Sequence, residues 1–359
     1  MEPISKEHDS QPDLTTTTEF DTPITESVSL DVPSQIEQAA AELETLIYEI
    51  KRVIVGQEHM VERLVVAMLT EGHILLEGLP GVAKTLAVST LSKCVGGEYV
   101  RLQFTPDLLP SDLVGTRIWK ANTETFDLEW GPVFANFVLT DEINRAPAKV
   151  QSALLEVMAE GQVSMAGQTK LVPDPFLVLA TQNPLESEGV YPLPEAQQDR
   201  FMMKVIVDHP DRAQEIEILH RMGVEAPVPA EVLPLERVKE IQQLVKQVYV
   251  DSSVSQYAVD IVMATREPSN HQLSDLEPVI EVGVSPRATL ALIAGARALA
   301  LLQGRHYVTA QDVFDIARDV LRHRLILSFE ALARSVTTDD VINRILSIVP
   351  ASETPPLSK

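Results

Sequence analysis

The sequence predicts an α/β domain with a five-stranded parallel sheet, followed by an all-α domain. Between residues 74 and 207, five short apolar runs alternate with helical stretches. This order is typical of a parallel sheet that is covered by helices on both faces. After Asp208 only helical periodicity remains. A glycine-bearing turn after the first predicted strand indicates where such a sheet binds its ligand.

The chain begins with a segment that lacks a periodic apolar pattern. Residues 1–33 hold eight acidic side chains against one lysine, and residues 15–18 are all threonine. This composition predicts a disordered acidic tail. Residues 351–359 are predicted to be a disordered C-terminus. The α/β domain is expected over residues 34–208 and the all-α domain over residues 209–350, with the junction near Asp208–Pro210.

The expected elements follow from the spacing of apolar residues. Two helices precede the sheet, one over Ile36–Val53 and one that ends at Leu69. The expected strands are Ile74–Leu76, Tyr99–Phe104, Phe137–Thr140, Phe176–Thr181 and Met203–Val207. The helices expected after the sheet are Asp211–Met222, Leu235–Val250, Val254–Arg266, Pro286–Gln303, Ala310–His323 and Thr338–Ile348.

The segment His73–Thr85 has the residues of a phosphate-binding loop. Its strand is followed by a turn with Gly78 and Gly81, and Lys84 and Thr85 then open a run of helix formers. The glycines let backbone N–H groups point at phosphate oxygens. A lysine here supplies charge for the β and γ phosphates, and the threonine hydroxyl suits Mg²⁺. An ordinary strand–turn–helix corner with a solvated lysine is the alternative.

One residue departs from the usual loop pattern. Glycine normally precedes the lysine, and this chain has Ala83. Alanine fits if that residue is already helical, so we interpret the segment as a variant of the loop.

Polar residues follow two further strands. Phe137–Thr140 runs directly into Asp141 and Glu142, at the edge of the sheet where α/β folds hold ligands. We expect Asp141 to orient the Mg²⁺ shell and Glu142 to polarise a water for attack on the γ phosphate. Two solvated acids are the alternative.

Two later residues extend the same series. Asn183 follows the fourth strand and is expected to hydrogen-bond the attacking water or the γ phosphate; an Asn-Pro turn is the alternative. Arg200 lies just before the fifth strand, where an arginine can complete charge stabilisation, often across a subunit boundary. Alone, such an arginine is usually a surface residue.

Two stretches interrupt the alternation of strands and helices. Residues 113–130 alternate around Ala121–Glu124, and residues 161–173 turn at Ala166–Gln168. Both patterns are typical of hairpins. They can be plain connections, although two hairpins beside a nucleotide site suggest levers that touch a substrate or a neighbouring subunit.

Composition limits the function classes. The chain has 29 basic and 52 acidic residues, a net charge of −23. Since nucleic-acid binding draws its affinity from clustered Lys and Arg, nucleic acid is not expected as the principal partner. No run approaches the ~20 apolar residues of a membrane span. One cysteine and an acidic N-terminus, unlike a signal peptide, predict a cytoplasmic protein.

Together these motifs resemble the AAA+ ATPases of the MoxR type, over about residues 36–350. The resemblance rests on Glu77–Thr85, Gly131–Ala146, Ala180–Pro184 and Tyr191–Phe201. An alanine before the lysine is common in that family. The implied fold is a P-loop AAA+ core with a five-stranded parallel sheet and two inserted hairpins, followed by an all-α lid domain.

The resemblance also implies roles for individual residues. Asp141 and Glu142 would be Walker B residues, Asn183 sensor 1 and Arg200 the arginine finger. Arg287 matches sensor 2, and the sequence leaves open whether it acts within its own chain. Thr85 and Asp141 would hold Mg²⁺. The implied ATP-binding residues are Val55, Gly56, Gln57, Gly78, Pro80, Gly81, Val82, Ala83, Lys84, Thr85 and Leu86.

Members of this family form homo-oligomeric rings, often hexamers, and act as chaperone-like remodellers of protein clients, often with a von Willebrand A domain partner. The resemblance therefore implies a Mg²⁺-dependent ATPase of this kind. Two alternatives remain: the motor subunit of a metal chelatase, which would need a partner that carries the chelation site, and a nucleotide-gated scaffold with little turnover.

Overall fold

The computed structural model describes residues 31–122, 124–184, 189–222 and 227–351, which belong to one compact unit that begins at Asp31. Residues 1–30 of the predicted tail and residues 352–359 of the predicted C-terminus lie outside the described residues. The first helix, α1 (Val32–Val53), begins inside the last two positions of the predicted tail. Pro33 lies in its first turn, where proline loses no helical hydrogen bond.

The predicted five-stranded parallel sheet is confirmed. Its strand order is β2-β5-β8-β1-β9, and every neighbouring pair is parallel. The strands are β1 (Ile74–Gly78), β2 (Tyr99–Gln103), β5 (Phe137–Asp141), β8 (Leu177–Gln182) and β9 (Met203–Val207). Strand β1 lies between β8 and β9, and β9 forms one edge of the sheet.

Successive residues of the central strands enter two different hydrophobic clusters. In β1, Ile74 and Leu76 belong to one cluster and Leu75 to the other, as the two-residue repeat of a strand requires. One cluster joins a face of the sheet to the early helices and to the C-terminal helices. The other joins the opposite face to the helix over residues 148–160. The predicted boundary near Asp208–Pro210 stays a prediction, because the first cluster extends across it.

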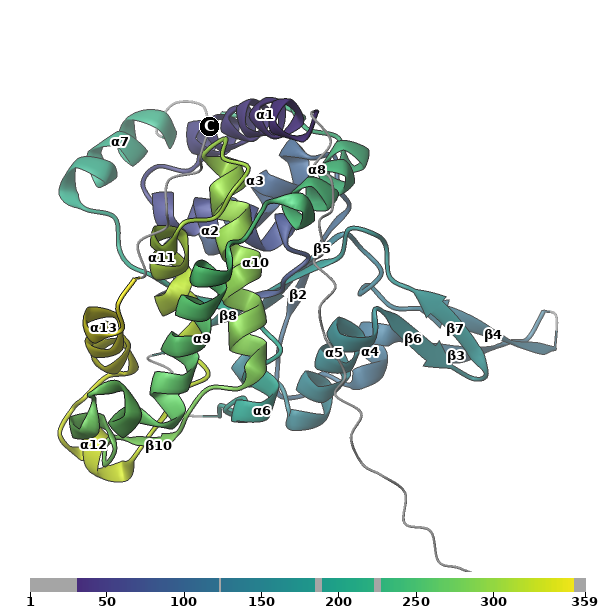
Figure 1. Cartoon of the computed structure of the whole chain (residues 1–359). Helices are drawn as coiled ribbons and strands as arrows, with labels where there is room; N and C mark the ends of the chain where they lie inside the picture. Colours follow the sequence, from purple (N-terminus) through teal and green to yellow (C-terminus); the bar gives the residue numbers. More distant parts are fainter. Residues whose placement is uncertain (1–30, 123, 185–188, 223–226, 352–359) are drawn as a thin grey trace, which may run out of the picture. The chain divides into compact units, whose positions relative to one another are not determined.

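Helices cover both faces of the sheet and continue beyond it (Figure 1). Those before β9, besides α1, are α2 (Glu58–Leu69), α3 (Lys84–Cys94), α4 (Pro110–Val114), α5 (Ala148–Glu160), α6 (Glu195–Gln198) and the 3-10 turn η1 (Ile143–Arg145). Those after β9 are α7 (Arg212–Met222), α8 (Leu235–Gln247), α9 (Ser252–Arg266), η2 (Pro268–His271), η3 (Ser274–Leu276), α10 (Pro286–Leu302), α11 (Ala310–Leu321), α12 (Phe329–Ala333) and α13 (Thr338–Ile348). The helical lid predicted after the sheet is therefore present.

The expectation that no strand follows residue 208 was wrong in one detail. Strands β10 (Ile280–Val282) and β11 (Ile326–Leu327) pair antiparallel within the lid. Each is too short to show a two-residue repeat in the sequence. Among the described residues, no helix is both long and apolar enough to cross a membrane.

Both predicted hairpins are present. They consist of β3 (Gly115–Lys120) with β4 (Thr125–Trp130), and of β6 (Gln162–Met165) with β7 (Gln168–Leu171). The first predicted turn includes residue 123, which lies outside the described residues. In the second, Ala166 and Gly167 have φ of 50° and 82°, the backbone of a two-residue hairpin turn.

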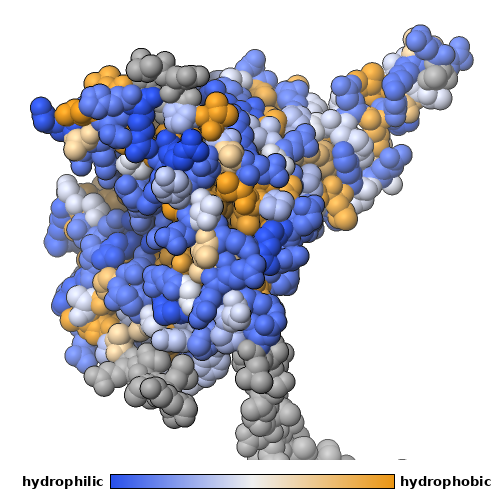
Figure 2. Space-filling view, turned by 90° about the horizontal axis from the view of Figure 1, so that it is seen from above, coloured by the Kyte–Doolittle hydropathy of each residue, from blue (hydrophilic) through white to orange (hydrophobic). Residues whose placement is uncertain are grey.

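The two hairpins lie side by side and project from the same side of the sheet (Figure 1). The Lys170 amine of β7 lies 5.4 Å from the centre of the Trp130 ring at the end of β4. The surface of the projecting part carries hydrophilic residues with hydrophobic residues among them (Figure 2). In the first hairpin, the side chains of Trp119 and Phe126 are 50% and 55% exposed. Exposed aromatic side chains on a projection suit contact with another molecule.

Candidate nucleotide site

A cavity of about 380 Å³ lies at the carboxyl edge of the sheet. We call it the phosphate-loop cavity. Its lining includes nine predicted site residues, which lie at or after the ends of three separate strands: Pro80, Gly81, Ala83, Lys84, Thr85, Leu86, Asp141, Glu142 and Asn183. The other lining residues are Arg101, Gln103, Thr181 and Gln182. The sequence-predicted acids, amide and loop are thus brought together around one space.

The two loop glycines are needed for different reasons. Gly81 has φ +86°, and a Cβ built on it would meet no atom within 4 Å. Its conformation favours glycine, and the space before it is open. Gly78 is the last residue of β1, and a Cβ there would lie 2.3 Å from the carbonyl oxygen of Val207. Glycine at this position allows β9 to approach.

Ala83 does not have the helical backbone that we expected. It has φ 64° and ψ 16°, in the left-handed region, and forms the N-cap of α3. The expectation assumed that the helix had already begun, whereas its first helical residue is Lys84. In this conformation the Cβ of Ala83 causes backbone strain, which glycine would avoid. The Ala83 carbonyl still accepts the Ala87 N–H at 2.9 Å and starts the helix.

The Lys84 amine lies inside the loop. It donates to the carbonyl oxygens of Gly78 and of Leu79, the latter at 3.1 Å. Burial lowers the pKa of Lys84, and the nearby carboxylates of Asp141 and Glu142 partly offset this effect. The lysine charge and the two acids thus line the same cavity.

Asp141 is held by two donors. Its Oδ1 accepts the Thr181 hydroxyl at 2.6 Å, and its Oδ2 accepts Arg101 Nη2 at 2.5 Å. The Asp141 partner raises the pKa of the half-exposed Arg101 guanidinium. Both carboxylate oxygens are therefore fixed in direction.

Glu142 is held by different groups. Its backbone N–H donates to the Thr181 hydroxyl at 2.9 Å, so one buried threonine positions both acids. Its carboxylate accepts Gln103 Nε2 at 2.8 Å and forms an ion pair with Arg145 at 3.1 Å. The carboxylate of Glu142, a residue that lines the cavity, is thus tied to β2 through Gln103 and to the turn η1 through Arg145.

Sequence reasoning missed Arg101, Gln103 and Thr181. A signal for them existed, since each lies near the carboxyl end of a predicted strand. In the register of β2 and β5, Gln103 lies opposite Asp141, and neighbouring parallel strands end at the same edge. The polar residues at these strand ends could therefore have been assigned to the site.

The donors present fit Mg²⁺. Thr85 and Asp141 both line the cavity and supply hydroxyl and carboxylate oxygens. Among the described residues, no group of three or more His, Cys, Asp or Glu side chains could hold a metal. Mg²⁺ is commonly bound by one or two protein oxygens together with water and substrate phosphates, rather than by a full protein cage.

Arg200 and Arg287 lie elsewhere. Both line a second cavity of about 370 Å³, which we call the arginine cavity. It shares no lining residue with the phosphate-loop cavity. Arg287 is 58% exposed and lies 3.6 Å from the Asp199 carboxylate. The structure therefore separates the two predicted arginines from Lys84 and Glu142 of the same chain.

The strip Val55–Gln57, expected beside the adenine, is absent from the lining of the phosphate-loop cavity. Gln57 Nε2 donates to the Asp208 carbonyl oxygen at 2.7 Å. Gly56 packs against Gln214 so closely that a Cβ would lie 2.7 Å from its side chain. The strip thus joins the end of β9 to α7, and its role toward adenine stays a prediction.

Comparisons with known proteins agree with this geometry. Residues 73–203 match the ATPase family associated with various cellular activities (AAA), and residues 273–345 match the AAA lid domain. The chain is 53% identical over 320 residues to Chaperone MoxR1 of Mycobacterium tuberculosis, covering 88% of this chain and 85% of that protein.

Two further relatives are similar over most of the chain. Protein MoxR of Paracoccus denitrificans is 33% identical over 293 residues, 77% of this chain and 86% of that protein. The crystal structure of a candidate ATPase from Cytophaga hutchinsonii has a TM-score of 0.85 and 43% identity, and covers 90% of this chain and 99% of that one.

Proposed function

Since the chain belongs to the MoxR family of AAA+ ATPases, we propose that it hydrolyses ATP at sites shared between neighbouring subunits of a ring. The observation that carries this proposal is the separation of the two cavities. One holds the loop, the acids and Asn183, and the other holds Arg200 and Arg287. A complete site then requires the phosphate-loop cavity of one subunit and the arginine cavity of the next.

The residues of the phosphate-loop cavity divide the chemistry among them. Lys84 and the loop N–H groups hold the phosphates, and Asn183 orients the attacking water. Glu142 takes a proton from that water. Thr85 and Asp141 would hold Mg²⁺, which neutralises charge on the phosphate oxygens. The contacts of Glu142 with Gln103 and Arg145 fix its carboxylate beside the cavity in which the attacking water would bind.

The arginines act on the neighbouring subunit. Negative charge spreads over the γ-phosphate oxygens during transfer, and an arginine that meets them there is worth about 10³–10⁵ in rate. Arg200 and Arg287 are both exposed, so their guanidinium groups are available to a second chain. We propose that both contribute across the subunit boundary.

The assembly and its task follow from the family. We propose a homo-oligomeric ring, most simply a hexamer, in the cytoplasm. It uses ATP turnover to remodel or activate protein clients, with a von Willebrand A domain protein as one partner. The two projecting hairpins with their exposed aromatic residues support contact with a client or a neighbour.

A subunit-mixing experiment tests the shared site. Arg200→Ala and Glu142→Gln should each be nearly inactive alone. After subunit exchange, an interface that pairs an intact Glu142 with an intact Arg200 is complete, and about a quarter of the interfaces in an equal mixture have that pairing. ATPase activity should recover accordingly and vanish on dilution. No recovery with verified exchange would show that Arg200 acts in its own chain or not at all.

Measuring the rate of ATP hydrolysis against protein concentration distinguishes this proposal from a nucleotide-gated scaffold. A ring enzyme that builds its sites between subunits should hydrolyse ATP at a rate per subunit that rises with protein concentration. A scaffold should bind ATP at any concentration with little hydrolysis.

A further inference from the structure

The free edge of β9 is covered by the lid rather than by another strand. Because β9 is an edge strand, carbonyl groups on its outer side need donors from elsewhere. Three consecutive side chains just after α11 donate to one carbonyl of β9, that of Lys204, and to the carbonyls of Phe201 and Met202 just before the strand. The contacts are Arg322 Nη1 to Lys204 O at 3.0 Å, His323 Nε2 to Phe201 O at 3.0 Å, and Arg324 to Phe201 O at 2.7 Å and Met202 O at 2.9 Å.

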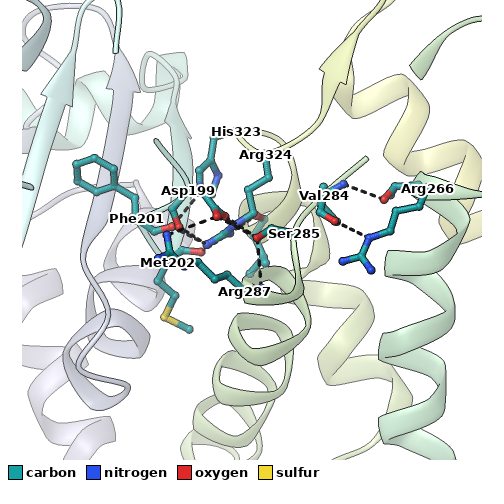
Figure 3. Close-up of polar contacts among 11 residues, drawn as sticks. Asp199, Phe201, Met202, Arg266, Val284, Ser285, Arg287, His323 and Arg324 are labelled. Carbon is teal, nitrogen blue, oxygen red and sulfur yellow. Dashed lines mark hydrogen bonds and ion pairs between the residues drawn. The ribbon is translucent and has the colours of Figure 1, made fainter. Parts of the chain in front are cut away.

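Arg324 contacts Asp199, Phe201 and Met202 (Figure 3), which flank Arg200 in the sequence. Its Nε donates to Asp199 Oδ1 at 2.8 Å, and its two terminal nitrogens donate to the carbonyls of Phe201 and Met202. The Arg324 side chain is 3% exposed. A planar guanidinium that is fully engaged in this way fixes the backbone it contacts more firmly than a flexible ammonium can.

Asp199 connects this contact to the start of α10. Its carboxylate also accepts the Ser285 hydroxyl at 2.9 Å and lies 3.6 Å from Arg287. Ser285 caps α10 by accepting the Arg287 N–H at 3.3 Å. Two lid segments, at residues 285–287 and 322–324, therefore meet at one carboxylate beside Arg200.

The environment of this cluster keeps its charges in a fixed arrangement. Burial lowers the pKa of Arg324, and its hydrogen bond to Asp199 opposes that shift. Burial and the Arg324 charge hold the pKa of His323 well below its usual range, so His323 is neutral and donates through Nε2. Removing Asp199 would leave the buried Arg324 charge without its ion-pair partner, whereas removing Arg324 would leave Asp199 with the more distant Arg287 at 3.6 Å.

Arg200 has no comparable anchor of its own. It is exposed, and within the part of the chain that the structure describes its guanidinium has no hydrogen-bond or ion-pair partner. The direction of its side chain is consequently set by the backbone of residues 199–202, which the lid holds.

We propose that Arg324, together with Asp199, is a positioning residue that lets the lid set where Arg200 points. This inference rests on the proposed role of Arg200 in the neighbouring site. A movement of the lid would shift Arg200, and the lid of one subunit would thereby govern hydrolysis in the next. A misplacement of about 1 Å in such a group costs up to about a hundredfold in rate.

The test uses two variants. Arg324→Lys keeps the positive charge but loses the planar set of N–H donors, and Asp199→Asn keeps the shape of the side chain but loses its negative charge. Arg318→Lys is the matched control, because Arg318 lies in α11 and donates to Asn343 instead. We expect the first two variants to lose about 10- to 100-fold in kcat with an unchanged Kd for ATP. The control should match the wild type.

Subunit mixing separates positioning from a general structural defect. Mixing Arg324→Lys or Asp199→Asn with Glu142→Gln subunits, whose Arg200 is intact, should restore ATPase activity. Mixing either variant with Arg200→Ala subunits should not. Three results would overturn the inference. They are recovery of activity on mixing with Arg200→Ala, a loss of ATP affinity in place of the loss in kcat, and failure of both variants to assemble. Recovery in the Arg200→Ala with Glu142→Gln mixture, without recovery for Arg324→Lys, would overturn it and leave the shared site intact.

Discussion

The phosphate-loop cavity and the arginine cavity hold their charged groups in different ways. In the first, the two acids are tied by Thr181, Arg101 and Gln103, all from neighbouring strands of one sheet. In the second, Arg200 and Arg287 are exposed, and the firm contacts lie beneath them, between Asp199 and Arg324. Under the proposed function, the acids that act within their own chain are fixed directly. Arg200, which is proposed to act on a second chain, is held through its backbone and stays open to that partner.

The largest effect should come from two changes within the phosphate-loop cavity. Lys84→Ala should abolish measurable ATP binding, because the phosphates lose the lysine charge of the loop. Glu142→Gln should bind ATP within a few-fold of the wild type and lose about 10²–10⁴ in kcat, because only water activation is removed. Binding of a fluorescent ATP analogue and phosphate release measure the two effects. Hydrolysis by Glu142→Gln near the wild-type rate would contradict the assignment.

A second prediction concerns the pH dependence of folding stability at His73, which lines the arginine cavity. His73 Nδ1 accepts the Val178 N–H at 3.1 Å, so its ring is neutral in the fold. Burial lowers the pKa of His73 from 6.5 to about 4. Between these values the unfolded chain binds a proton that the folded chain does not. Stability is therefore fully present above pH 6.5 and falls as the pH decreases toward 4.

The expected size follows from that window. Between pH 7 and pH 5, His73 should remove about 2 kcal/mol from the free energy of unfolding. Denaturant unfolding at both pH values should show a loss about 2 kcal/mol smaller in His73→Gln than in the wild type. Equal losses would show that His73 titrates normally in the fold. The free energy of unfolding of His73→Gln at pH 7 does not need to match that of the wild type, because only the change between the two pH values is compared.

The sequence was sufficient for the parallel sheet, both hairpins, the loop and the strand-end acids. Each of these depends on a local pattern: an apolar run, an alternation, or a polar residue directly after a strand. Lys84, Asp141, Glu142 and Asn183 could be assigned to one cavity because parallel strands end at a common edge.

The remaining contacts depend on long-range packing that no local pattern encodes. Arg324 meets Asp199 across 125 positions of the chain, and β10 and β11 pair although they are only three and two residues long. Ala83 shows a different limit. The residue type allowed a helical backbone, and the tight loop before α3 selected the left-handed one instead.

Thr181→Val tests whether the acids of the phosphate-loop cavity need their shared anchor. Valine has nearly the same shape, yet it removes the hydroxyl that donates to Asp141 and accepts the Glu142 N–H. We expect kcat to fall about tenfold, which corresponds to ~1.4 kcal/mol, the net worth of about one such hydrogen bond. Thr181→Ser keeps the hydroxyl and should retain most of the activity. In mixtures, Thr181→Val should be rescued by Arg200→Ala and not by Glu142→Gln; the reverse pattern would place its effect on the arginine side.

The smallest effect is expected at Ala83. The order of stability among glycine, alanine and valine at this position distinguishes a left-handed backbone from a helical one. For a left-handed residue, glycine removes a strain of about 1–2 kcal/mol and loses about 0.5–1 kcal/mol through its freer unfolded chain. Ala83→Gly should therefore raise the free energy of unfolding by up to about 1 kcal/mol, whereas Ala83→Val, branched at Cβ, should lower it. The order is Gly, Ala, Val. A helical residue would give Ala, Val, Gly, because glycine is then the poorest of the three. Thermal unfolding of the three proteins measures the order, and a maximum at alanine would restore the helical interpretation of the loop.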